Sequence, residues 1–348
     1  FGSSLTRTLE CWRQSIVLVQ ETMQELPMHA WLSLAIVLPL GALWMAKTCF
    51  GFDNSTDPID PVEAFTHSKF MTPKALRRLR VSFAALFVLF LGLGLATKWD
   101  GGNFAMYLTW WAYVLQTLFM VFLALACHRQ LSRMEQKQYA NLEQPVLGID
   151  DPLSLIERVY MTLQSIALPS SLSVTVLYWF GIVPVWKICE LTGEDPASSD
   201  CIAFPGILSL FVHFVNTILI FIEFLDSKIP FGRQNAGWVF ALLVVWHAWS
   251  LMHYFLRIGR SDGCESNYFP TTYPRDQCPI YPIVDWHKPR ESLIVIAGVL
   301  FVLAPISNIV CLGFAAMRDQ FKDYKLDETQ LFHSEGLSTM DAKPANNV

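Results

Sequence analysis

The chain has little charge and lacks the short motifs that mark many enzymes and sensors. Of its 348 residues only 16% are Asp, Glu, Lys or Arg, whereas 53% are hydrophobic. It contains no CxxC pair, no histidine-rich metal-ligand spacing, no phosphate-binding glycine loop and no ladder of arginines within an apolar stretch. These absences argue against a redox carrier, a nucleotide-dependent enzyme and a voltage sensor. We therefore expect no metal, no cofactor and no nucleic-acid partner.

Long apolar runs rich in aromatic residues take the place of such motifs. The chain holds twelve Trp and twenty-five Phe, and its mean hydropathy is +0.36. A membrane-crossing helix needs about 20 largely apolar residues. The sequence thus predicts an all-α, polytopic membrane bundle of about seven transmembrane helices. The expected spans are Trp31 to Phe50, Val81 to Thr97, Phe104 to Cys127, Ser165 to Trp186, a span within 204–233, Gly237 to Ile258, and Leu293 to Met317.

The two ends of the chain differ from this core. Residues 1–27 are predicted to form an amphipathic helix on the membrane surface, because apolar residues recur there at helical spacing. We divide the chain into an N-terminal part over 1–50, a six-span core over 51–318 and a polar tail over 319–348.

Basic residues predict the orientation. Most Lys and Arg lie in the loops after the first, third and fifth spans and in the tail. The positive-inside bias then makes this a multi-pass protein with a cytoplasmic C-terminus and a lumenal or extracellular N-terminus. A glycosylation sequon at Asn54 points the other way, because it falls in a loop placed in the cytoplasm.

Four cysteines lie in the loops assigned to the non-cytoplasmic side. Cys189 and Cys201 flank one loop, and Cys264 and Cys278 lie in the other. Disulfide bonds persist in lumenal and extracellular compartments. We predict one disulfide bond in each loop; free thiols near the membrane ends are the alternative.

A polar stripe marks the fifth span. Its members are separated by four, three, seven and four residues, which places them on one side of a helix: Ser209, His213, Asn216, Glu223 and Ser227. Ionisable groups within a membrane are costly and normally face the bundle interior. We expect the stripe to point inward, with Glu223 near the cytoplasmic end in an ion pair or at interfacial water.

The third span carries a similar stripe of Thr109, Tyr113 and Gln116. Thr109 and His213 are expected at matching depth, roughly 8–14 Å below the same membrane face. A hydroxyl and an imidazole so placed are typical of a nucleophile and its base. The alternatives are a threonine bonded to its own helix backbone and a histidine that bridges two helices.

Other polar residues of the spans are weaker candidates. His253 lies on the sixth span near the membrane face toward which Thr109 opens, and Tyr254 beside it is a hydrogen-bond donor. Asn216, Tyr113 and His253 are therefore taken as possible supporting or oxyanion-binding residues. The indoles of Trp110 and Trp111 are further oxyanion donors.

Three segments resemble a known family. YLTWWAYVLQTLF at 107–119, HFVNTILIFIEFLDSKIPF at 213–231 and IYPIVDWHKP at 280–289 are similar to the rolling stone proteins. They also resemble, more distantly, the androgen-induced transmembrane threonine hydrolases. The resemblance covers roughly residues 50–318. It implies a membrane enzyme in which an intramembrane Thr and His hydrolyse esters of fatty acids with hydroxy fatty acids.

In that family the Thr lies in a Leu-Thr pair and the His precedes an acidic residue by ten positions, which corresponds here to Thr109 and His213. The chain departs from the hydrolases in its extra N-terminal helix and span, its cysteine-bearing insertion at 259–279, and Asn216. Rolling stone members are associated with myoblast fusion, which implies no enzymatic role.

The leading hypothesis is an integral-membrane lipid-ester hydrolase whose partners are membrane lipids. The alternative is a non-catalytic adhesion or fusion protein, or an accessory subunit that binds other membrane proteins. A transporter or channel is a third class, and it lacks the ring of charges or the paired broken helices that such proteins show. The contact between Thr109 and His213 and its access to a cavity distinguish the first two.

Overall fold

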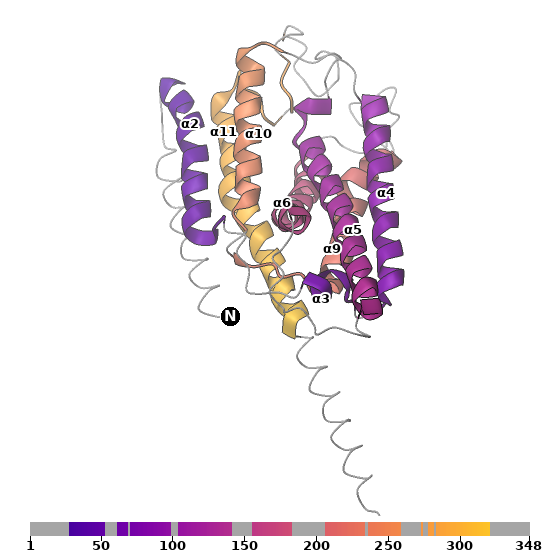
Figure 1. Cartoon of the computed structure of the whole chain (residues 1–348). Helices are drawn as coiled ribbons and strands as arrows, with labels where there is room; N and C mark the ends of the chain where they lie inside the picture. The colour runs from indigo at the N-terminus through magenta and orange to yellow at the C-terminus, as the bar shows by residue number, and fades with distance from the viewer. Residues whose placement is uncertain are drawn as a thin grey trace, which may run out of the picture.

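Helices account for the regular structure in the part of the chain that can be described. The computed structural model describes residues 28–52, 61–68, 70–98, 104–140, 155–182, 206–233, 236–258, 273, 278–281 and 283–320. Within these ranges the only β-type pairing is an isolated bridge between Tyr281 and Val284. Figure 1 shows the long helices gathered in one bundle. The predicted all-α fold is confirmed.

Short π-helical segments, labelled η, follow or connect several of the α-helices. In chain order the elements are α2 (Met28–Met45), η1 (Ala46–Phe50), α3 (Pro61–Thr66), α4 (Pro73–Lys98), α5 (Leu108–Ala140), α6 (Leu155–Val176), η3 (Leu177–Ile182), α8 (Ile207–Leu210), η4 (Phe211–Val215), α9 (Asn216–Asp226), α10 (Trp238–Phe255), α11 (Pro289–Gly298) and η7 (Val299–Leu303). After η7 the chain continues as α-helix over 304–320.

Six of the described helical segments are long and apolar enough to cross a membrane. They are Ser33–Phe50, Pro73–Thr97, Leu108–Gln136, Ile207–Asp226, Trp238–Phe255 and Pro289–Gln320. These segments coincide with the first, second, third, fifth, sixth and seventh predicted spans. The chain is therefore a multi-pass membrane protein.

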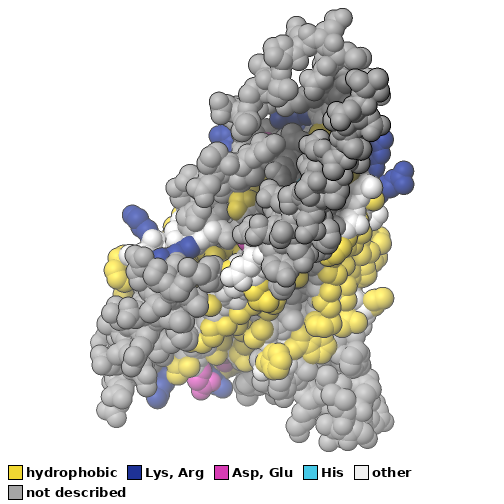
Figure 2. All heavy atoms as spheres, turned by 90° about the horizontal axis from the view of Figure 1, so that it is seen from below, with side chains coloured by type: hydrophobic (Ala, Val, Ile, Leu, Met, Phe, Trp, Pro, Cys, Tyr) yellow, Lys and Arg dark blue, Asp and Glu magenta, His cyan; other side chains and the backbone are white. Residues whose placement is uncertain are grey.

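The outward faces of these segments are apolar. On α9, Ile218, Ile222 and Leu225 are exposed at helical spacing, and Val81 and Val88 are exposed on α4. In the view from below, the visible Lys and Arg side chains lie toward the margins and hydrophobic side chains lie between them (Figure 2). Such faces are stable in contact with lipid, because every backbone polar group of a helix is already paired within it.

The predicted fourth span, Ser165 to Trp186, has a different place in the bundle. Its described part is α6 with η3, which are not among the six candidate spans. α6 contacts α5, α9 and α10, and three of its serines, Ser170, Ser171 and Ser173, are buried. It lies in the middle of the bundle in Figure 1. A helix enclosed by protein on several sides needs no continuous apolar surface, which explains its more polar sequence.

Buried polar contacts connect the helices inside the bundle. The Arg80 guanidinium of α4 donates through Nε to Glu223 Oε1 of α9 over 2.9 Å, and both side chains are buried. Glu223 therefore belongs to a structural ion pair. Nearer the middle, Asn216 Nδ2 donates to Gln116 Oε1 over 2.7 Å. The polar stripes of the third and fifth predicted spans thus face each other inside the bundle.

Several predictions concern segments outside the described residues. These are the amphipathic helix over 1–27, the sequon at Asn54, the loop cysteines Cys189, Cys201 and Cys264, and the tail beyond residue 320.

Candidate active site

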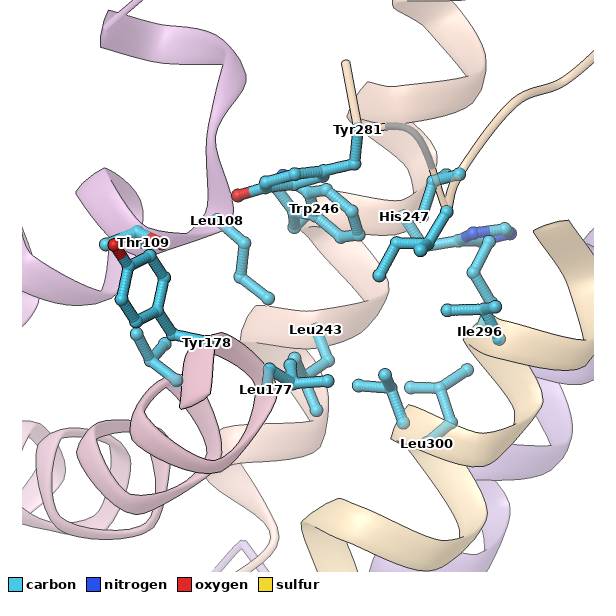
Figure 3. A pocket seen from close by; sticks show the side chains of 15 residues that line it. Leu108, Thr109, Leu177, Tyr178, Leu243, Trp246, His247, Tyr281, Ile296 and Leu300 are labelled. Atoms are coloured by element: carbon cyan, nitrogen blue, oxygen red, sulfur yellow. The ribbon is translucent and has the colours of Figure 1, made fainter. Parts of the chain in front are cut away.

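An apolar cavity opens between α5, η3, α10 and α11. The empty space within its lining, including that at the open mouth, is about 640 Å³. Leu108 and Thr109 line it from α5, and most of the remaining wall is aliphatic or aromatic. Figure 3 shows Thr109 and Tyr178 at one end and Ile296 and Leu300 at the other. The cavity suits an apolar chain with few polar groups.

Three π-helical segments lie at this cavity. Tyr178 belongs to η3, His213 to η4, and Leu300 to η7. Tyr178 and Leu300 line the cavity, and His213 contacts Thr109 in its wall. A π-helical turn inserts an extra residue into a helix and changes the direction of its side chains, and such turns are frequent at functional sites.

Thr109 and His213, which the sequence pairs by depth, are brought together. Thr109 Oγ1 lies 3.4 Å from His213 Nε2. This separation exceeds a normal hydrogen-bond length, as is common for a nucleophile and base in structures without substrate. Both side chains are half-buried, and Thr109 is on the cavity wall.

Thr109 is free to face the imidazole because it is the second residue of α5. A threonine in the middle of a helix bonds the carbonyl one turn before it, as Thr117 does to the Tyr113 carbonyl over 2.8 Å. The corresponding carbonyl for Thr109 is that of Ala105, which accepts from the Trp111 indole over 2.7 Å. The helix start thus leaves the Thr109 hydroxyl available to His213.

The hydrogen bonds of His213 fix which nitrogen carries its proton. Nδ1 lies 2.8 Å from the Ser209 carbonyl oxygen and 3.2 Å from Ser209 Oγ. Because a carbonyl oxygen can only accept, Nδ1 carries the hydrogen in the neutral ring. Nε2 is then an acceptor directed at the Thr109 hydroxyl. This is the tautomer that a general base requires.

Tyr178 holds the imidazole from one side. Its ring stacks on that of His213 with centroids 3.6 Å apart and planes inclined by 14°. Its hydroxyl lies 2.9 Å from Ser209 Oγ, so that Tyr178 and His213 share the same serine as neighbour. Sequence reasoning missed Tyr178, because it lies on a separate helix.

Tyr281 is the second residue that the sequence did not single out. It lines the cavity before α11, together with Leu108 and Thr109 of α5. A phenolic hydroxyl is thus carried by the wall of the cavity that Thr109 lines. The sequence could have pointed to Tyr281, because this residue lies in the segment 280–289 that carries part of the family resemblance.

The three supporting residues expected from the sequence lie elsewhere. Tyr113 is fully buried and donates its hydroxyl to the Phe87 carbonyl over 3.0 Å. Asn216 donates to Gln116 and to the Val212 carbonyl and accepts from the Thr217 amide, so both ends of its amide group are occupied. Neither lines the cavity beside Thr109.

His253 borders a separate, smaller hollow together with Cys278 and His287. The indole of Trp111 is occupied by the Ala105 carbonyl, and Trp110 packs its ring against Phe104 with centroids 4.5 Å apart. None of these expected residues is therefore a free donor beside Thr109.

No described cysteine lines this cavity. Among the described cysteines, Cys127 and Cys311 carry free, buried thiols. In the part of the chain that the structure describes, no group of three His, Cys, Asp or Glu side chains is placed to hold a metal ion.

No protein-family model, curated protein or solved structure matches the chain.

Proposed function

We propose that this protein is an integral-membrane lipid-ester hydrolase with Thr109 as nucleophile and His213 as base. One observation carries the proposal. The Thr109 hydroxyl, on the wall of an apolar cavity, lies 3.4 Å from the nitrogen of His213 that the Ser209 carbonyl leaves unprotonated. The family resemblance of the segments around these two residues supports the same assignment.

In the first half of the reaction, His213 Nε2 takes the proton of the Thr109 hydroxyl as Oγ1 bonds to the ester carbonyl carbon. The carbonyl oxygen becomes an oxyanion. When the tetrahedral intermediate collapses, the bond between carbon and the alcohol oxygen breaks, and the imidazolium gives its proton to the departing alcohol. The acyl group remains on Thr109.

In the second half, a water molecule gives a proton to His213 Nε2 and bonds to the acyl carbon. The bond to Thr109 Oγ1 then breaks, and the proton returns from the imidazolium to Oγ1. Throughout, the carbonyl of Ser209 and the ring of Tyr178 hold the imidazole in one orientation.

One donor for the oxyanion lies on the wall of this cavity. Tyr281 lines the cavity together with Leu108 and Thr109, and we assign its hydroxyl as the oxyanion donor. Preoriented donors act strongly in a site that excludes water, and removal of one typically lowers the rate by about 10²–10³-fold.

The proposed substrates are lipid esters that arrive from the bilayer, such as fatty-acid esters of hydroxy fatty acids. The cavity wall is almost entirely apolar, and the helices around it expose apolar side chains on their outer faces. The choice of ester follows from the family resemblance.

Substitution of the two reacting residues tests the proposal. Thr109→Ala and His213→Ala should each abolish hydrolysis of a fatty-acid ester of a hydroxy fatty acid by the detergent-solubilised protein. The double variant should lose hardly more than either single variant, because members of one catalytic unit are strongly non-additive. Labelling by a fluorophosphonate probe should be lost in Thr109→Ala.

Thr117→Ala is the matched control, since Thr117 lies on the same helix and donates to the Tyr113 carbonyl of its own backbone, away from the cavity. It should keep full turnover. Both threonine variants should express normally, because an interhelical side-chain hydrogen bond in a membrane protein contributes only about 0.6 kcal/mol on average. Turnover that persists in Thr109→Ala would exclude Thr109 as nucleophile. Absence of turnover in the parent chain with any lipid ester would favour a non-catalytic membrane protein.

A further inference from the structure

Two basic side chains from different helices meet at one end of the bundle. Arg77 Nη1 of α4 lies 3.5 Å from His128 Nδ1 of α5, and His128 is exposed. Three residues further along α4, Arg80 is buried and pairs with Glu223. Arg77 has no such counter-charge, because the described part of the chain brings no carboxylate within ion-pair distance of it. The pair of Arg77 and His128, called the basic site below, therefore lacks an anion among the described residues.

The contact between Arg77 and His128 leaves hydrogen-bond donors for a ligand. Arginine has no acceptor, so His128 Nδ1 accepts in this contact and Nε2 carries the hydrogen of the neutral ring. Among the described residues, no acceptor pairs with this Nε2–H or with the other N–H groups of the guanidinium. Lys74 and Arg78 of α4 are exposed nearby in the sequence and add two cations. The complementary ligand is an anion with several acceptor oxygens, such as a phosphate group.

Exposed apolar side chains continue from the basic site along both helices, which pack against each other (Figure 1). On α4, Val81 lies one turn after Arg77, and both Val81 and Val88 are exposed. On α5, Leu125 lies one turn before His128 and is exposed. Residues three or four apart share one face of a helix. The outward apolar faces of two candidate spans thus end at the basic site.

The length of α4 sets Arg77 at the expected membrane boundary. The candidate span that contains α4 ends at Thr97, about 20 residues after Arg77. At a rise of about 1.5 Å per residue this distance is roughly 30 Å, which is the thickness of the hydrocarbon core. Arg77 therefore lies at the level of lipid head groups.

We propose that the basic site binds the head group of an anionic phospholipid, with Arg77 and His128 donating to its phosphate oxygens. The acyl chains lie along the exposed faces of α4 and α5. Arginine matches a phosphate group with two parallel N–H donors, and basic pockets between transmembrane helices bind anionic head groups. A zwitterionic lipid carries the same phosphate together with a cation, which Lys74 and Arg78 repel. The inference is independent of ester hydrolysis.

The experiment titrates the purified full chain, in a neutral detergent, with dioleoyl phosphatidylserine, dioleoyl phosphatidylcholine or inorganic phosphate. The salt concentration is about 0.15 M, so that charges beyond roughly 8 Å are screened. The ligand-dependent rise in unfolding temperature gives each dissociation constant. We expect phosphatidylserine to bind at least about 5-fold more tightly than phosphatidylcholine, since one basic residue near an anionic lipid contributes on this order. Inorganic phosphate should give no comparable rise.

Substitutions at the basic site test which residues carry this preference. Arg77→Gln and His128→Leu should each weaken phosphatidylserine binding by about 5-fold and leave phosphatidylcholine binding unchanged. Arg77→Lys should lose part of the preference, because it keeps the charge without the planar pair of donors. Arg158→Gln is the matched control, since it removes an equal charge from an exposed position on α6, which is not among the candidate spans. It should keep the preference.

Equal binding of the two phospholipids by the parent chain would overturn this inference. Equal weakening by Arg77→Gln and Arg158→Gln would also overturn it, because net charge and not the basic site would then attract the lipid. A rise with inorganic phosphate as large as that with phosphatidylserine would assign the site to a free anion. If Arg77→Gln does not fold, Arg77→Lys and the comparison of ligands on the parent chain decide the matter. None of these outcomes depends on esterase activity.

Discussion

One tyrosine lines the cavity and another belongs to the packing of the bundle. Tyr281 is half-buried and lines the cavity with Thr109, whereas Tyr113 is fully buried and donates its hydroxyl to the Phe87 carbonyl away from the cavity. Tyr281→Phe should lower kcat by about 10²–10³-fold with little change in KM, because an oxyanion donor acts mainly in the transition state. Tyr113→Phe should leave kcat unchanged and reduce stability by about 1 kcal/mol.

The measurements are steady-state hydrolysis of a lipid ester and thermal unfolding in detergent, made on both variants. Equal kcat in Tyr281→Phe and the parent chain would remove Tyr281 from the oxyanion site. A comparable loss of kcat in both variants would indicate that each acts through packing.

Part of this site can be predicted from the sequences of individual helices. Helical periodicity and distance from the membrane face place Thr109 and His213 at matching depth, and the structure brings them within 3.4 Å. The same periodicity directs Tyr113 and Asn216 inward, but it cannot tell which inward polar atoms neighbouring helices already occupy. Tyr178 and Tyr281 reach the site from other segments, and their register depends on packing between helices.

Among the helices, the approach of α4 to the start of α5 positions the nucleophile. Gly94 of α4 packs so closely that a Cβ there would overlap the ring of Trp110, the residue after Thr109. Gly94→Ala should destabilise the protein by about 1–3 kcal/mol, because the surrounding side chains must shift. It should also lower turnover, since the first turn of α5 carries Thr109.

Gly92→Ala provides the comparison on the same helix, since a Cβ at Gly92 would meet no described atom within 4 Å beyond the neighbouring backbone of α4. This variant should be unchanged or stabilised by up to about 1 kcal/mol through higher helix propensity. Thermal unfolding and ester hydrolysis of the two variants test the pair. Equal stability would mean that α4 and α5 approach less closely than described.

Apolar length identifies most of these helices in advance, because a span must match the hydrocarbon thickness. Apolar length locates α6 in the sequence, but it does not show that other helices enclose α6. An enclosed helix and a lipid-facing helix can have similar lengths and differ mainly in their surroundings. The π-helical segments η3 and η4 could not be predicted, because one extra residue in a turn is favoured by local packing and leaves no periodic signature.

For the whole molecule, we propose that the C-terminus is cytoplasmic and the N-terminus lumenal or extracellular. The proposal follows from the distribution of Lys and Arg in the loops. Protease applied to sealed cells should spare an epitope tag placed at the C-terminus and digest it only after permeabilisation. Digestion from outside the cell would reverse the orientation.

The same orientation supports the proposed disulfide bond between Cys264 and Cys278. Cys278 is not among the free thiols of the structure, in contrast to Cys127 and Cys311. A loop of about 15 residues closed by a disulfide bond contributes roughly 3 kcal/mol in the chain-entropy treatment. Thiol labelling under denaturing, non-reducing conditions should leave Cys264 and Cys278 unmodified, and labelling of both would exclude the bond. Cys189 and Cys201 can be tested in the same way.

The enclosed position of α6 has a consequence for the order in which the protein is made. Ser173 of α6 donates to Ser307 over 2.9 Å, and Ser307 lies in the last described helix. Ser173 therefore meets this partner only after the ribosome has synthesised residue 307. In nascent chains truncated after residue 233, the Ser173→Cys variant should react with a membrane-permeant maleimide more strongly than the parent sequence does. In the chain that extends through residue 348, position 173 should be protected from the reagent. Equal protection in both would mean that α6 is covered earlier, during synthesis.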